Sequence, residues 1–356
     1  MTIELCVDCR ERDASLHVRN RRLCAACFIR YVTSKILKRM ESYRFKNLRG
    51  DQKRRLFLPI SGGVSSFVLL QILDAQLQKQ IANRNRTAYD LVVVRVMLLD
   101  EDIQATVRSS YEDVAHRFPM HVFLPLLALH DVLRLDRNLE RDLKHIGIQR
   151  KEGEPDEILT RRMLSSTASV ATRTELQSIL LQRLLVSAAK EQKCESILWG
   201  HSDSRLAALV LADVAKGRGG SVPSTIADGL SPHGINFNYP MRDLFKTELQ
   251  TYAQTLSDPL LHGVAQNDDT SKPPSTVRNT SIDSLLNTYI TSQGEKYPSL
   301  VANVVRTASK LELKNTGDNV IACPVCAMTN TTSTGMPNSN SSLCYGCQRM
   351  KQDIRS

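Results

Sequence analysis

The sequence lacks the long apolar stretches that membrane proteins need. No uninterrupted apolar run approaches the roughly 18 to 20 residues that a membrane span requires. The first residues, MTIELCVDC, also lack the basic and then apolar layout of a secretory signal peptide. We therefore expect a soluble, intracellular protein whose 356 residues form one large domain with appendages, or two domains.

Cysteine is scarce in the middle of the chain, where Cys194 is the only one between residues 28 and 322. The other eight form two quartets of C-x2-C pairs near the two ends: Cys6, Cys9, Cys24 and Cys27, and then Cys323, Cys326, Cys344 and Cys347. Without a secretory signal, this arrangement favours thiolate–metal sites over disulfides. The spacing is close to that of structural zinc ribbons. We expect one zinc ion per quartet, with buried or redox-active thiols as the alternative.

Acidic residues are few in the first 55 positions. Fifteen Lys and Arg stand there against six Asp and Glu, so this segment supplies +9 of the chain's net charge of +10. Such a segment suits a polyanion, because cations that meet phosphates release condensed counterions. A solvated helix face is the alternative interpretation.

The central sequence alternates apolar runs with stretches of helical periodicity. We expect strands at 56–60, 90–100, 121–126 and 195–200, and helices at 67–77, 174–191 and 205–215. Strands alternating with helices of this length indicate a doubly wound parallel sheet, which places the chain in the α/β class. A basic helix follows Cys27, residues 266–280 are polar and proline-bearing, and helical periodicity resumes at 281–312.

These patterns divide the chain into six parts. We predict an N-terminal zinc module at 1–30, a basic connecting helix at 31–55, the α/β domain at 56–262, a polar linker at 263–282, a helical segment at 283–318 and a C-terminal zinc ribbon at 319–356.

The loop after the first expected strand reads SGGVSS at residues 61–66, without lysine and without an acid. In open parallel sheets, ligands bind at the carboxyl ends of the strands. The two glycines permit close backbone approach, the following helix start favours an anion, and the serines add hydroxyl donors. An ordinary glycine-rich turn is the alternative.

The loop is similar to the PP-loop signature of ATP pyrophosphatases, SGGxDS, and GHSDSRLA at 200–207 resembles the GHxxDDxAE stretch of tRNA-thiolating members. Together with the two quartets, KGRGGSVP at 216–223 and YPMRDL at 239–244, these motifs resemble the cytoplasmic tRNA 2-thiolation protein 2 family over nearly the whole chain. The resemblance implies a sheet of the PP-loop ATP pyrophosphatase type, also called adenine nucleotide alpha hydrolase-like, with a small zinc module at each end.

The loop departs from the pattern of active PP-loop enzymes. Ser65 stands where those enzymes have aspartate, and Val64 where many have lysine. Ser204 and Arg205 stand where two carboxylates are expected, and Asp203 falls one place early. Thiolating members also use three central cysteines, whereas residues 165–178 carry serine and threonine, and Cys194 is better interpreted as a buried thiol.

We therefore predict a pseudo-enzyme subunit without catalytic residues, and the missing charges put ATP binding in doubt. The degenerate nucleotide loop comprises Ser61, Gly62, Gly63, Ser65, Ser66, Gly200, His201 and Asp203.

The resemblance implies a cytoplasmic heterodimer with a catalytic PP-loop subunit. That partner would take sulfur from a thiocarboxylated ubiquitin-like carrier and form 2-thiouridine at the wobble position of the tRNAs for lysine, glutamate and glutamine. A role in attaching the carrier to other proteins, urmylation, stays open. The present chain would supply the tRNA-binding surface. Its candidate contacts are Arg21, Arg22, Lys35, Lys38, Arg39, Arg44, Lys53, Arg54, Arg55, Lys216 and Arg218.

Two other functions fit the same residues. One is a self-sufficient ATP-dependent tRNA sulfurtransferase, in which serines replace the usual groups and Cys194 carries sulfur. The other is a zinc-ribbon scaffold protein without direct RNA contact. ATP turnover by the isolated chain distinguishes the first, and tRNA titration across salt concentrations distinguishes the second.

Overall fold

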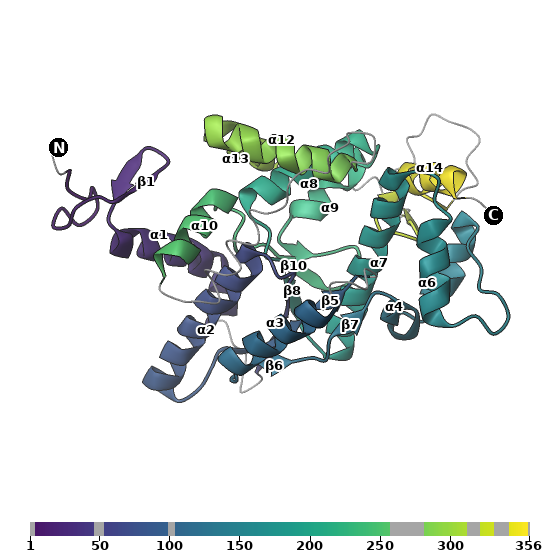
Figure 1. Ribbon diagram of the computed structural model, residues 1–356, viewed down its shortest axis with the longest axis horizontal. Helices are drawn as coiled ribbons and strands as arrows, with labels where there is room; N and C mark the ends of the chain where they lie inside the picture. The colour runs from purple at the N-terminus through teal and green to yellow at the C-terminus, as the bar shows by residue number, and fades with distance from the viewer. Residues whose placement is uncertain are drawn as a thin grey trace.

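A central sheet organises the computed structural model, which describes residues 4–45, 53–98, 104–256, 281–311, 321–330 and 342–354 (Figure 1). Within these residues the sheet has the order β6-β4-β3-β8-β10-β9. Its strands are β3 (Arg54–Pro59), β4 (Tyr89–Val94), β6 (Val122–Phe123), β8 (Ser196–Leu198), β9 (Gly229–Leu230) and β10 (Asn236–Asn238). All neighbours pair in parallel except β9, which runs antiparallel to β10 at one edge. The predicted doubly wound parallel sheet is confirmed.

The strand order reverses beside β3, which pairs with β4 on one side and with β8 on the other. The main connecting helices are α2 (Val64–Arg84), α3 (Gln104–Arg117), α7 (Val170–Glu191) and α8 (Asp203–Ala215). Because β3 ends at Pro59 and α2 begins at Val64, the loop at 61–66 lies at this switch point. Open α/β sheets bind their ligands at such a point.

Side chains of the central strands alternate between two cores. Leu56 and Leu58 belong to the core that contains α1 (Ala25–Arg39), α2 and α10 (Lys246–Thr255), whereas Phe57 belongs to the core that contains α8 and α9 (Val222–Ile226). This alternation is the period-2 geometry of a strand. Both faces of the sheet are therefore covered, as a parallel sheet requires.

The N-terminal module continues directly into α1. A hairpin of β1 (Leu16–Val18) and β2 (Arg21–Leu23) precedes Cys24, the N-cap of that helix. Phe28, Val32 and Ile36 are fully buried at helical spacing against the main core. The predicted basic helix thus begins before residue 31 and ends at Arg39, where a short 3-10 turn (Glu41–Tyr43) follows.

Two helices, α12 (Ile282–Lys296) and α13 (Pro298–Ala308), form where the sequence resumes helical periodicity after residue 281. Both helices pack on α8 (Figure 1). The predicted linker lies outside the described residues except at its last two positions. None of the helices in the described ranges combines the length and apolar character that a bilayer crossing demands.

The C-terminal module docks far from the N-terminal one, on a side of the molecule built from residues 127–165 (Figure 1). It contains β11 (Ile321–Ala322), β12 (Thr329–Asn330) and α14 (Tyr345–Asp353). It shares one hydrophobic core with α4 (Asp131–Leu135), α5 (Leu139–Leu143), α6 (Asp156–Ser165) and α7. Val96 of β5 (Val96–Met97) and Leu127 of β7 (Leu127–Ala128) pack against this core. Asp353 accepts hydrogen bonds from the backbone and hydroxyl of Ser169, at 3.1 and 2.5 Å, and so ties α14 to the start of α7.

Candidate functional site

A cavity of about 460 Å³ lies at the carboxyl edge of the sheet, between the loop at 61–66, the start of α8 and α12. Five serines line it, together with the cations Arg205 and Lys246, and none of its described lining residues is an Asp, Glu or Cys. We call it the loop cavity. Gly200 lets the end of β8 approach the loop, because a Cβ there would lie 3.2 Å from the Ser66 Cα.

The backbone of the loop is shaped by Gly62, whose φ of +85° favours glycine. A Cβ at this position would lie only 2.6 Å from Nη2 of Arg95, so the guanidinium rests against the loop backbone. Arg95 follows β4, and its Nη1 donates to Ser110 Oγ at 2.8 Å. Sequence reasoning missed this cation, because Arg95 stands 33 positions from Gly62.

Trp199 and His201, which lie between the end of β8 and the start of α8, each have a hydrogen-bonding atom without a partner among the described residues. His201 stacks on Trp199 and on Tyr239, with ring centroids 5.4 and 5.9 Å apart. Burial, aided by the charge of Arg205, lowers the pKa of His201 to about 3, so its ring is neutral at pH 7. Trp199 Nε1 and His201 Nδ1 are buried without a hydrogen-bond partner among the described residues.

Asp203 does not face the loop cavity, contrary to its assignment to the nucleotide loop. Its carboxyl group lines a separate groove of about 400 Å³ beside α1 and α13, together with Arg19 and Asp243. Burial raises the pKa of Asp203 to about 7 against the attraction of Arg19. The structure brings Ser61, Gly63, Ser65, Ser66, Gly200 and His201 together around one cavity, and Gly62 lies in the loop beside it.

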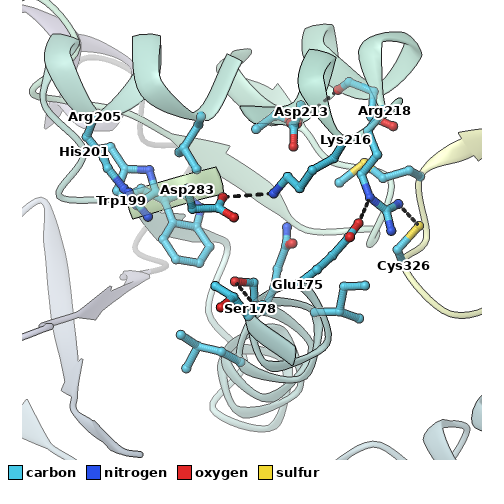
Figure 2. Close-up of a pocket in the computed structure, with 18 of the residues that line it drawn as sticks. Glu175, Ser178, Trp199, His201, Arg205, Asp213, Lys216, Arg218, Asp283 and Cys326 are labelled. Atoms are coloured by element: carbon cyan, nitrogen blue, oxygen red, sulfur yellow. Dashed lines mark hydrogen bonds and ion pairs between the residues drawn. The ribbon is translucent and has the colours of Figure 1, made fainter. Parts of the chain in front are cut away.

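A second, inner cavity of about 260 Å³ adjoins the loop cavity and shares Trp199, His201 and Arg205 with it. Figure 2 shows these three residues at one end and Arg218 with Cys326 at the other. Glu175 of α7 lines this cavity, so the stretch at 165–178 contributes a carboxylate to it.

Two buried ion pairs cross the inner cavity (Figure 2). Lys216 Nζ lies 2.9 Å from Asp283 Oδ1 of α12, and Arg218 pairs with Glu175. Lys216 and Arg218 are only 6% and 8% exposed. Their assignment to an RNA-binding surface is therefore wrong, because their charges are already neutralised inside the protein.

Arg218 also contacts the second cysteine quartet. Its Nη1 donates to Cys326 Sγ and Cys344 Sγ, both at 3.3 Å, and its Nη2 donates to Cys347 Sγ at 3.4 Å. Gly346 leaves room for this guanidinium, because a Cβ there would lie 2.6 Å from Arg218 Cζ. The KGRGG motif is thus the docking point of the C-terminal module.

Both quartets have the geometry of a four-thiolate metal site. In each quartet the four sulfurs lie within 4.8 Å of one another, with Cys9 Sγ and Cys24 Sγ 3.9 Å apart and Cys326 Sγ and Cys344 Sγ 3.6 Å apart. Zn–S bonds of about 2.3 Å in a tetrahedron place sulfurs roughly 3.8 Å apart. The residues present therefore fit a tetrahedral metal ion at either end of the chain.

Cys194 lies at the opposite edge of the sheet from the loop, because it precedes β8 whereas the loop cavity follows that strand. Its side chain is 8% exposed, and burial raises the pKa of the thiol to about 11. A protonated thiol at this edge does not reach the loop cavity, which supports the interpretation as a buried structural cysteine.

The remaining cationic candidates form a broad and largely paired surface. Lys35 and Arg39 of α1 bind Asp243, at its backbone oxygen and its carboxylate, and Arg54 lies 3.4 Å from Glu195. The exposed Lys38 has no such partner in the described residues. The other pairs are Arg21 with Asp8, Arg22 with Glu4, Arg44 with Glu41, Lys53 with Asp90, and Arg55 with the Gln192 carbonyl.

Comparison with solved structures defines the fold class of the chain. The fold matches the U34-tRNA thiolase NcsA from Methanococcus maripaludis, a structure with a 4Fe-4S cluster, at a TM-score of 0.61 and 14% identity over 100% of this chain and 98% of that one. Together with the loop at the switch point, this match makes the chain a protein of the PP-loop α/β fold.

The particular family follows from sequence. A family model described as cytoplasmic tRNA 2-thiolation protein 2 matches residues 281–335. Proteins of that name from Neosartorya fischeri and Coccidioides immitis are 38% and 37% identical, over 98% and 99% of this chain and 97% and 98% of their own lengths. The chain belongs to the cytoplasmic tRNA 2-thiolation protein 2 family.

Proposed function

We propose that the chain is a non-catalytic subunit of a cytoplasmic tRNA 2-thiolation complex, in which it binds tRNA and pairs with a catalytic PP-loop subunit. The composition of the loop cavity carries this proposal, because two cations and five serines line it and no Asp, Glu or Cys among the described residues does. Loss of one preorganised charge-stabilising group typically costs ~10² to 10³ in rate. Among the described lining residues, the groups for metal and for sulfur are both missing.

The chemistry in this proposal belongs to the partner. That subunit activates the wobble uridine with ATP and accepts sulfur from a thiocarboxylated ubiquitin-like carrier. The present chain contributes tRNA affinity through phosphate contacts, since RNA of regular shape is recognised largely through its backbone. Lys38 on α1, with Arg54 and Arg55 at the start of β3, offers exposed or half-exposed cations for this contact.

The two quartets hold zinc in this proposal, and each zinc ion is structural. Four thiolates leave no open coordination position, which suits a structural rather than a catalytic role. The buried Arg218 offsets negative charge at the C-terminal site through its three N–H to sulfur contacts.

A reconstitution tests the proposed function. Unmodified tRNA, ATP and the sulfur-loaded carrier are incubated with the catalytic subunit alone, with this chain alone, and with both, and 2-thiouridine is measured by nucleoside mass spectrometry. Product from the pair, with none from this chain alone, is expected. Product from this chain alone would favour the self-sufficient sulfurtransferase, and absence of any tRNA gel shift would favour the scaffold.

A further inference from the structure

We propose that an apolar groove along α13 is the surface that binds the catalytic subunit, through an apolar helix face of that subunit flanked by acidic side chains. This inference rests on the proposed function, because it names the surface for the partner assigned there. The groove has a volume of about 640 Å³, and Val210 of α8 lines it opposite the residues of α13. We call it the α13 groove.

Helix α13 carries two apolar stripes, and the core of the protein covers only one. The stripe that is buried in the core containing α8 consists of Val301, Val305 and Ala308. The stripe that lines the α13 groove consists of Tyr297, Leu300, Val304 and Leu311. An amphipathic surface helix normally turns one apolar stripe toward the core and a polar face toward water. The second stripe therefore lacks a cover among the described residues.

The exposure of this second stripe is high for apolar side chains. Tyr297, Leu300 and Leu311 are 59%, 42% and 51% exposed. Val214, one helical turn beyond Val210 on α8, is 57% exposed. Both helices lie on the outside of the molecule, where a partner can approach them (Figure 1). Apolar side chains that gather on a surface in this way mark sites of protein interaction.

The lining of the groove favours a protein over RNA. None of its described lining residues is an Asp, Glu, Lys or Arg. A nucleic-acid backbone gains its affinity from cations that meet phosphates, which this groove does not offer. Interfaces between proteins have an apolar centre depleted of charge and a polar rim. The α13 groove has the composition of such a centre.

The rim of the groove selects the kind of protein. Every exposed charged side chain described between residues 296 and 311 is a cation, namely Lys296, Arg306 and Lys310. None of the three has an ion-pair partner among the described residues. The other side of α13 lines the groove beside α1, which holds five cations and two acids. Acidic side chains around the apolar face of the partner would complement this rim, which sets orientation and speeds association.

The same charges argue against a second copy of this chain as the occupant. Two copies that meet through the α13 groove would bring the cations of both rims together, and the whole chain already carries a net charge of +10. Like charges at an interface oppose association. A different, acidic partner therefore fits this surface better than a second copy does.

Biolayer interferometry between the immobilised catalytic subunit and the full, zinc-loaded chain tests the inference. Leu300→Glu should weaken binding by about tenfold or more, because it removes an apolar anchor and buries a charge in the interface. Ile158→Glu is the matched control, since Ile158 is 51% exposed on α6, away from the groove. The control should bind as the unaltered chain does, and circular dichroism confirms that both variants are folded.

A second pair of variants tests the rim. Lys310→Glu should slow association with the catalytic subunit at low salt and reduce the effect of added salt on that rate. Lys351→Glu changes an exposed cation on α14 instead and should leave both quantities unchanged. Equal association rates for the two variants would contradict the complementary rim.

Light scattering of the isolated chain and a tRNA gel shift separate the other occupants. A dimer of this chain that Leu300→Glu dissociates would assign the groove to a second copy. A gel shift lost in Leu300→Glu, with unchanged binding to the catalytic subunit, would assign it to RNA. Either result overturns the inference. Tight subunit binding that is equal in the unaltered chain and Leu300→Glu overturns the inference alone, whereas no binding by the unaltered chain refutes the proposed pairing as well.

Discussion

Asp203 and Arg205 lie two residues apart in the first turn of α8, yet their side chains line different cavities. Two residues span about 200° around a helix, so the side chains point to nearly opposite sides. The cation consequently faces the loop cavity and the acid faces the groove beside α1. The described lining of the loop cavity therefore carries cations and no carboxylate, whereas a nucleotide-cleaving enzyme needs carboxylates there for its metal.

The contact between Arg218 and three cysteine sulfurs should strengthen metal binding by the C-terminal quartet. Arg218→Gln should lower zinc affinity of the C-terminal quartet by about 10- to 100-fold, because outer hydrogen bonds tune metal ligands by such factors. Competition with a chromophoric chelator measures the affinity. Arg349→Gln is the control, since Arg349 contacts the same Glu175 at 3.2 Å but no described sulfur. Equal zinc release from both variants would contradict the assigned role.

The buried pair of Lys216 and Asp283 predicts a stability coupling between α8 and α12. Lys216→Met leaves the Asp283 carboxylate unpaired in the interior and should cost about 3 kcal/mol of unfolding free energy. The double variant with Asp283→Asn should recover most of that loss, because it removes the orphaned charge as well. Urea unfolding of the four proteins gives the coupling energy, and additive effects would show that the two residues do not interact.

The raised pKa of Asp203, about 7, predicts how the free energy of unfolding changes with pH. Between its ordinary value of 3.8 and 7, the folded chain binds this proton and the unfolded chain has lost it. The contribution of Asp203 to stability therefore falls as the pH rises through this window, by about 1.4 kcal/mol per unit. Asp203→Asn should stabilise the protein at pH 8 by up to about 4 kcal/mol relative to the unaltered chain, with no gain near pH 4. Thermal unfolding at both pH values measures the difference, and a destabilised variant at pH 8 would refute it.

The exposed Arg55 and the half-buried Arg54 at the start of β3 predict a salt effect on tRNA binding. Replacing Arg54 and Arg55 by Gln should weaken binding to all tRNAs alike and reduce the slope of log K against log salt by up to about 0.9 per lost phosphate contact. Fluorescence anisotropy between 50 and about 200 mM salt measures this slope. An unchanged slope would remove this surface from the RNA interface.

The strongly apolar parts of the fold are predictable from the sequence, and its polar interior is not. The runs at 56–60 and 90–100 predict β3 and β4 because every second side chain must enter one of two cores. Strand β10 escapes prediction, since Asn236-Phe237-Asn238 has a single apolar residue. The orientation of Asp203 could have been foreseen from helix geometry once α8 was placed.

The misassigned pair Lys216 and Arg218 shows why charged motifs mislead. Their partners Asp283, Glu175 and Cys326 stand more than 40 positions away in sequence, so only the folded chain reveals that these cations are buried. A basic, glycine-rich stretch has the same appearance on a nucleic-acid surface and at an internal docking point.

The central claim is that this chain retains the pocket of a PP-loop protein without the groups that cleave ATP. The most direct test measures AMP and pyrophosphate release by the isolated, zinc-loaded chain with magnesium, ATP and unmodified tRNA, against a blank without protein. We predict a rate equal to the blank, rising only when the catalytic subunit is added. Sustained release by the isolated chain, abolished by Ser65→Ala or Cys194→Ala, would contradict the account.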